Sequence, residues 1–199
     1  MTAQPVKSCD WMPLDEAQTA TARTTRLDGF LRSVERRALR IAELSVGSRD
    51  EALDLVQDAM LAFVRNYAAK PEADWPPLFY RVLDSRVTDW HRRSRVRGRW
   101  LGSWWPAARE DDDEDPVAAA ADPAEAGPLA RLIGEDAGQA LEGALRNQPL
   151  RQRQAFLLRI WEGLDVADTA TAMRCGEGSV KTHLWRALAA LRAALEAHR

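Results

Sequence analysis

Six side chains near the C-terminal end of the sequence could read the edges of DNA bases. Lysine and arginine can donate to guanine acceptors, serine and threonine can bond to any base, and tryptophan can offer an apolar contact to a thymine methyl group. The six residues are Ser179, Lys181, Thr182, His183, Trp185 and Arg186. Apolar residues recur every three or four positions from Val180 to Leu195, which predicts an amphipathic helix with these six near its N-terminal end. Helices that read the major groove present their first turns in this way.

A second short helix must hold that helix in place. Val166, Ala170 and Met173 mark one face of it, and the turn at 174–176 separates the two helices. Helices joined by so short a turn cross steeply, which favours a helix-turn-helix unit. Helix pairs of this kind are also common in all-α cores, and a basic exposed face is often only a solvated face. The spacing alone leaves both interpretations open.

Positive charge is concentrated in a second place. Basic and acidic residues number 17 against 14 in residues 1–99, 2 against 11 in 100–145, and 9 against 5 in 146–199. Residues 90–109 contain no acid, and this stretch predicts a surface that contacts DNA phosphates rather than a solubilising helix end. The run consists of Arg92, Arg93, Arg95, Arg97 and Arg99.

The chain divides at an acidic segment. Residues 104–128 are rich in Pro, Ala and acids and have no helical or strand period, which predicts a flexible linker. We therefore expect an all-α protein with two small helical domains, at 26–103 and 129–199, and a disordered tail at 1–25. The linker could act as a mimic of RNA or as a plain tether.

Three helices are predicted in the first domain. Gly47 is placed to end the first helix, and Ser48 with Glu51 has the pattern of a capping box for the second. Pro71 is predicted to stop the second helix, and the third begins near Leu78, after a loop that contains Trp75. The outer face of the second helix carries Asp54, Gln57 and Asp58.

Several classes of protein are disfavoured. Cys9 and Cys175 are far apart and lie in no zinc-binding pattern, no run of about 20 apolar residues could cross a bilayer, and the N-terminus does not resemble a secretory signal. The acidic run at 110–115 is a poor metal site, because adjacent acids in an unstructured tract hold no fixed coordination shell. We expect a cytoplasmic protein that is not an enzyme, has no metal or other cofactor and does not insert into membranes.

The ordered set of motifs resembles the extracytoplasmic-function (ECF) sigma factors, the smallest group of the bacterial sigma-70 family. ALDLVQDAMLAFVRNY at 52–67 is similar to region 2.2 of the family, and FYRVLDSRVTDWHRRSR at 79–95 to regions 2.3 and 2.4. The segments at 141–164 and 178–195 resemble region 4. The resemblance implies a region 2 bundle of three to four helices and a region 4 helix-turn-helix.

The resemblance also implies roles for particular residues. Asp54, Gln57 and Asp58 match positions that dock on core RNA polymerase. Sites that meet the minus-10 element and capture a flipped base would be Lys70, Trp75, Ser85, Arg86, Arg92 and Arg93, with Glu72 and Asp74 in the same loop. The minus-35 element would be read by Ser179, Lys181, Thr182, His183, Trp185 and Arg186.

The expected partners are core RNA polymerase and promoter DNA, and an anti-sigma protein is a further partner that many family members have. Thr169, Arg174 and Gly176 depart from the family pattern, which has an apolar residue, a small residue and Ser there. A stand-alone helix-turn-helix regulator is the alternative function, and it gives no reason for the face at Asp54, Gln57 and Asp58.

Overall fold

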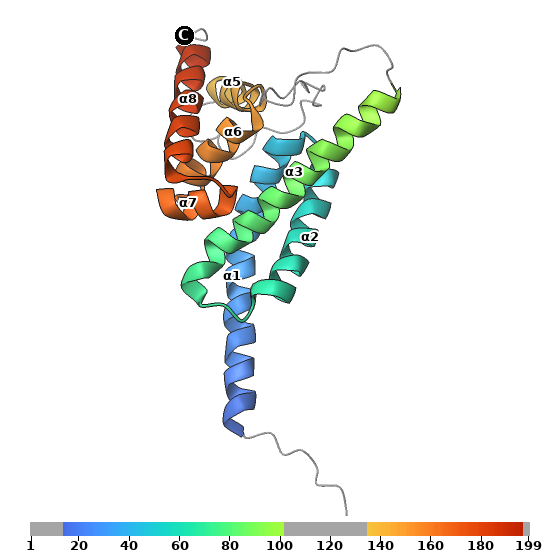
Figure 1. Cartoon of the computed structure of the whole chain (residues 1–199), viewed down its shortest axis with the longest axis vertical. Coiled ribbons are helices and arrows are strands. Elements are labelled where there is room, and N and C mark those ends of the chain that lie inside the picture. Colours follow the sequence, from blue (N-terminus) through green and yellow to red (C-terminus); the bar gives the residue numbers. More distant parts are fainter. Residues whose placement is uncertain (1–13, 102–134, 197–199) are drawn as a thin grey trace, which may run out of the picture. The chain divides into compact units, whose positions relative to one another are not determined.

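The computed structural model describes residues 14–101 and 135–196, and every regular element in these ranges is helical (Figure 1). This confirms the expected all-α class. Side chains are described for residues 21–95 and 138–196. The linker predicted at 104–128 and its acidic run lie outside the described residues. By contact, residues 1–34 form one compact unit and residues 35–199 another.

The first helix, α1 (Leu14–Val46), begins earlier than the sequence indicates. Its first twelve residues fall in the segment predicted as a disordered tail, and that part of the prediction is corrected. Within residues 1–34, Leu27 and Val34 are buried, and Arg32 pairs with Asp28 at 3.0 Å. Periodic apolar residues bury one face of the helix, so the same pattern that predicted it also holds it.

The junction between α1 and α2 (Arg49–Tyr67) follows the sequence closely. Gly47 has a φ of 80°, a left-handed conformation that favours glycine, and its N–H donates to the Glu43 carbonyl at 2.9 Å. The Ser48 hydroxyl accepts from the Glu51 N–H at 3.5 Å, as the capping pattern predicts. The helix ends at Tyr67, four residues before Pro71, and a short turn, η1 (Glu72–Asp74), follows.

Helix α3 (Trp75–Leu101) starts three residues before the predicted position. Two prolines occupy its first turn, where a proline removes no helical hydrogen bond and its fixed φ suits the helix. The helix packs on α2 through edge-to-face rings, with centroids 5.8 Å apart for Phe63 and Phe79 and 6.5 Å for Phe63 and Trp75. These contacts form the core of the α1–α3 region.

The C-terminal region begins with α5 (Glu135–Arg146), α6 (Leu150–Phe156) and a π-helical turn, η2 (Leu157–Trp161). The helix-turn-helix consists of α7 (Val166–Met173) and α8 (Glu177–Glu196). Both α5 and α6 pack against α8, and Gln148 Nε2 donates to the Ala187 carbonyl at 3.0 Å. The principal buried residues here are Leu145, Leu157, Met173, Val180, Ala187 and Leu191.

The three departures from the family pattern are accommodated locally. Thr169 is fully buried, but its hydroxyl donates to the Asp165 carbonyl at 2.6 Å, so the polar group is satisfied inside the helix. Arg174 takes a left-handed conformation with a φ of 52°, which ends α7. Gly176 accepts from the Ser179 N–H at 2.9 Å through its carbonyl and so starts α8 without a side-chain cap.

No helix in the parts of the chain that the structure describes is long and apolar enough to cross a membrane.

Candidate nucleic-acid interface

The N-terminal turns of α8 present the side chains expected to read DNA. Five of the six are exposed, and the sixth, His183, is half-buried. Lys181 and Trp185 lie one helical turn apart, as do Thr182 and Arg186, so each pair shares one side of the helix. The Trp185 side chain is 70% exposed, although tryptophan usually buries most of its large apolar surface. An exposed surface that combines charge with an aromatic ring can contact both phosphates and bases.

His183 differs from its five neighbours. Its Nδ1 is buried and the residue is half-buried, because it lies close to the apolar stripe that begins at Val180. A side chain in this position reaches a base edge less readily than Lys181 or Trp185.

The basic end of α3 supplies a second surface. Arg92 and Arg93 are exposed, and Arg93 Nε donates to the Asp89 carbonyl at 3.2 Å. Ser85 and Arg86, two turns earlier, are half-buried. The side chains of Arg97 and Arg99 lie outside the described residues. Two arginines of the predicted run are thus free to approach a phosphate backbone.

The loop before α3 corrects one prediction. Trp75 is only 2% exposed, its ring packs against Phe63, and its indole Nε1 donates to the Lys70 carbonyl at 3.0 Å. A ring held in this way cannot stack on a flipped base, so Trp75 belongs to the core. Lys70, Glu72 and Asp74 are exposed around it. The indole therefore fixes the backbone of the loop while the charged side chains stay accessible.

The outer face of α2 contains more than the three polar residues predicted for it. Asp54, Gln57 and Asp58 are exposed, and Leu61, one turn further along the same face, is 56% exposed. Leu53 and Val64 border it at 37% and 38%. The sequence signal for this apolar component was that Leu61 falls outside the buried stripe of the helix.

Asp84 is a buried charge that the sequence analysis did not single out. It is 8% exposed, and its Oδ2 lies 3.6 Å from Arg151 Nη1, which comes from α6. Burial raises the pKa of Asp84 to about 6, while the nearby Arg151 and Arg174 act in the opposite direction. Its position in the stripe of Tyr80, Leu83 and Val87 was the available signal, because a charge in an apolar stripe needs a partner.

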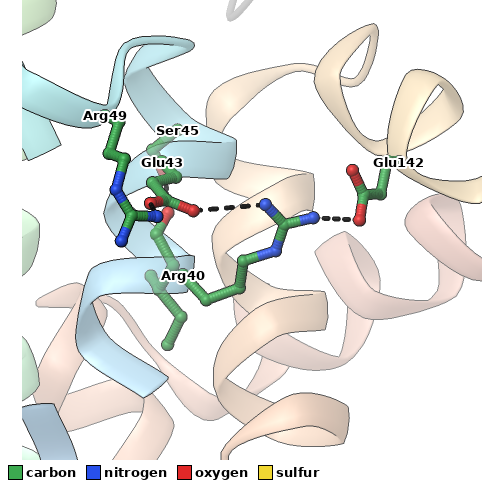
Figure 2. Close-up of polar contacts among 6 residues, drawn as sticks. Arg40, Glu43, Ser45, Arg49 and Glu142 are labelled. Carbon is green, nitrogen blue, oxygen red and sulfur yellow. Dashed lines mark hydrogen bonds and ion pairs between the residues drawn. The ribbon is translucent and has the colours of Figure 1, made fainter. Parts of the chain in front are cut away.

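Two further ion pairs join α1 to the C-terminal helices. Arg37 Nε lies 3.4 Å from Glu162 Oε2, and Arg40 bridges Glu43 of its own helix and Glu142 of α5 (Figure 2). The carboxylate of Glu162 faces the phenol of Tyr80, and burial raises the pKa of both groups. No cluster of His, Cys, Asp or Glu that could hold a metal ion occurs among residues 14–101 and 135–196.

Comparison with known proteins bears on both regions. The family model for sigma-70 region 4 matches residues 139–191, which run from α5 into α8. The RNA polymerase sigma-E factor of Streptomyces avermitilis is 31% identical over 177 residues, covering 86% of this chain and 82% of the relative. The ECF RNA polymerase sigma factor SigM of Mycobacterium tuberculosis is 28% identical over 165 residues, covering 82% of this chain and 74% of the relative.

A solved structure shares the fold. It is the sigma factor RpoE from Bartonella quintana in complex with the anti-sigma factor NepR, with a TM-score of 0.56 and 23% identity, covering 86% of this chain and 99% of that chain. The helix-turn-helix match and the extent of the identity to the Streptomyces relative agree with this likeness. The chain belongs to the extracytoplasmic-function sigma factors of the sigma-70 family.

Proposed function

We propose that this sigma factor connects core RNA polymerase to promoter DNA in the cytoplasm through three exposed surfaces, without catalysing a reaction itself. The surfaces are the outer face of α2, the basic end of α3 and the first turns of α8. One observation carries the proposal: polar side chains at family-matched positions are exposed on each of these helices, while the apolar residues of the same helices are buried. A surface of this kind is available to a partner without unfolding the helix that carries it.

The outer face of α2 is assigned to core polymerase. Asp54, Asp58 and Gln57 surround the exposed apolar surface of Leu61. Interfaces between proteins commonly place an apolar centre inside a polar rim. Two carboxylates on this rim favour a basic partner surface and also orient the complex, because a like-charged surface would be repelled.

The basic end of α3 is assigned to the minus-10 element. Arg92 and Arg93 are exposed and can neutralise phosphates, which releases counterions and adds affinity. Ser85, Arg86 and the exposed Lys70 lie closer to the start of the helix, where an extruded base would be held. Trp75 is assigned a structural role in this site, because its bond to the Lys70 carbonyl positions the loop.

The first turns of α8 are assigned to the minus-35 element. Lys181 and Arg186 supply donors for guanine or phosphate, and Trp185 supplies apolar contact. Thr182 donates its hydroxyl to the Gly178 carbonyl at 3.0 Å, so this hydroxyl must exchange one partner for another to reach a base.

Run-off transcription with purified core polymerase tests the proposal. The chain should produce promoter-dependent transcripts from genomic fragments, and the double variant Asp54→Lys/Asp58→Lys should lose them together with core binding. A matched control is Asp28→Lys/Glu35→Lys, which makes the same charge change on exposed residues of α1. Absence of both core binding and transcripts with the unmodified chain would refute the proposal.

The same variants separate a sigma factor from a stand-alone regulator. A regulator that acts without polymerase should keep its activity when Asp54 and Asp58 are reversed, and the full chain alone should bind duplex DNA tightly. A sigma factor should lose transcription in that variant while its melting temperature stays the same.

A further inference from the structure

The helices on the two sides of residues 102–134 contact each other through a surface that promoter binding does not use. Helix α7 packs on α3, and the turn that follows α7 lies close to Asp84 of α3. Both Arg174 and Cys175 of this turn interact electrostatically with Asp84. The turn that sets the angle of the helix-turn-helix is therefore in contact with the helix assigned to the minus-10 element.

The centre of this contact is apolar. Ile41, Leu83 and Val87 line a small cavity from the N-terminal side, and Leu158 closes it from η2. All but Ile41 are less than 4% exposed, and Ile41 is 6% exposed. Burial of such side chains removes apolar surface from water, which gives the contact its attraction.

Two ion pairs at the edge complement this attraction. Arg37 pairs with Glu162, and Arg40 pairs with Glu142, as Figure 2 shows for the second pair. The Arg40 and Glu142 side chains are only 11% and 13% exposed, so solvent screens this pair less than a surface pair.

Other polar groups oppose the contact. Asp84 Oδ1, Gln154 Nε2 and Glu162 Oε2 are buried without a hydrogen-bond partner among the protein atoms that the structure describes. Separation of the helices would expose these groups to water. A buried charge such as Asp84 also loses more by desolvation than Arg151 at 3.6 Å returns, as the raised pKa indicates. The contact is thus balanced between apolar attraction and polar cost.

The arrangement cannot serve both promoter elements together. Elements about 25 base pairs apart are separated by about 85 Å of B-DNA at about 3.4 Å per base pair. Helix α3 has 27 residues, and at about 1.5 Å per residue it is about 40 Å long. With α7 packed on α3, the first turns of α8 and the basic end of α3 cannot reach sites so far apart.

We propose that the contact of α1 and α3 with α5, α6 and α7 is an autoinhibitory closed state, which opens when the sigma factor engages core polymerase. This inference rests on the proposed function. The occupant of the α3 surface in the closed state is the chain's own helix-turn-helix, and the pairs Arg37–Glu162 and Arg40–Glu142 hold it there.

Distance measurements on the full-length chain test the closed state without polymerase or DNA. Spin labels are placed at Arg65→Cys on α2 and Arg192→Cys on α8, both exposed positions, with Cys9→Ser and Cys175→Ser as background. Pulsed EPR should give one narrow, short distance distribution. A broad distribution that extends to long distances would overturn the proposal.

An opening variant makes the test sharper. Arg37→Glu with Glu142→Arg turns both edge pairs into like-charge contacts, and the closed population should fall about fivefold. The fourfold swap Arg37→Glu, Glu162→Arg, Arg40→Glu, Glu142→Arg restores opposite charges and should restore the short distance. Arg32→Glu is the matched control, because Arg32 pairs only with Asp28 within α1. Retention of the short distance in the opening variant would refute the role of these pairs.

Transcription provides the second readout. The opening variant should reach half-maximal transcription at about a fivefold lower sigma concentration than the unmodified chain, since less of it is closed. An unchanged concentration would overturn autoinhibition. A chain that gave no transcripts at all, with the distance results as expected, would instead count against the proposed function.

Discussion

Two tryptophans that were both assigned to DNA contacts have opposite environments. Trp75, at the start of α3, is 2% exposed and donates a hydrogen bond to the Lys70 carbonyl, whereas Trp185, on α8, is 70% exposed. The first holds a loop in position from inside the core, and the second offers its ring to a partner. The two DNA-binding surfaces therefore differ in kind: the α8 surface is already exposed, while the start of the α3 surface depends on the core beneath it.

The largest expected effect comes from removal of the buried ring. Trp75→Ala should lower the free energy of unfolding by about 3–5 kcal/mol, because it leaves a cavity beside Phe63 and Phe79 and removes the bond to the Lys70 carbonyl. Trp185→Ala should change it by less than about 0.5 kcal/mol. Urea denaturation of both variants measures the difference, and equal losses of stability would contradict the contrast between them.

The exposed surface of α8 should show the reverse behaviour. Lys181→Ala and Arg186→Ala should each weaken binding of polymerase holoenzyme to the minus-35 element by about 1–3 kcal/mol if they contact guanine. A uniform loss on all sequences, with a smaller salt dependence, would assign them to phosphates instead. Arg192→Ala, further along the same helix and exposed, is the control and should bind normally.

The pH dependence of the closed state offers a third comparison, between Asp84 and an exposed acid of the same helix. Burial raises the pKa of Asp84 from 3.8 to about 6, and the groups that face it are Arg151 and Gln154 from α6 and Arg174 and Cys175 from the turn. A carboxyl with a raised pKa stabilises the closed state fully below about pH 4, and this stabilisation is lost as the pH rises through 6.

Asp84→Asn should therefore remove the pH dependence of the closed population between about pH 4 and 6 and increase that population at pH 7. Asp89→Asn, on an exposed position of α3, should leave the profile unchanged. The spin-label distances described above provide the measurement. A variant Asp84→Asn that opened at pH 7 would show that the ion pair with Arg151 outweighs the cost of burying the charge.

The smallest effect is expected at the turn between α7 and α8. Arg174 has a φ of 52°, a conformation that costs a residue with a Cβ more than it costs glycine. Arg174→Gly should therefore raise the free energy of unfolding by about 0.5–1 kcal/mol, after the larger unfolded-state entropy of glycine is subtracted. Gly47→Ala, at a φ of 80°, should lower it. Thermal unfolding of the two variants shows whether both turns follow the same rule.

Much of the architecture could be predicted from local patterns. The left-handed Gly47, the Ser48 cap and the apolar period of α2 act over a few residues, so the sequence contains all the groups involved. The prediction failed at helix starts. Two prolines after Trp75 suggested a rigid loop, although prolines also fit the first turn of a helix, and the structure begins α3 there.

The candidate surfaces were predictable to a lesser extent. The exposed positions on α2 and α8 followed from helical period, because a side chain outside the buried stripe faces outward. His183 is an exception, since it borders the stripe and is half-buried. The roles of these residues in polymerase and promoter binding stay predictions until the variants are measured.

The sequence by itself determined the helices, their caps and the family, because periodicity, capping groups and motifs act locally or in a fixed order. Only the tertiary structure decided that Trp75 is buried while Trp185 is exposed, and that Asp84 meets Arg151. Asp84 and Arg151 are 67 positions apart along the chain. Burial of a side chain depends on atoms that distant segments bring to it, and no local pattern contains that information.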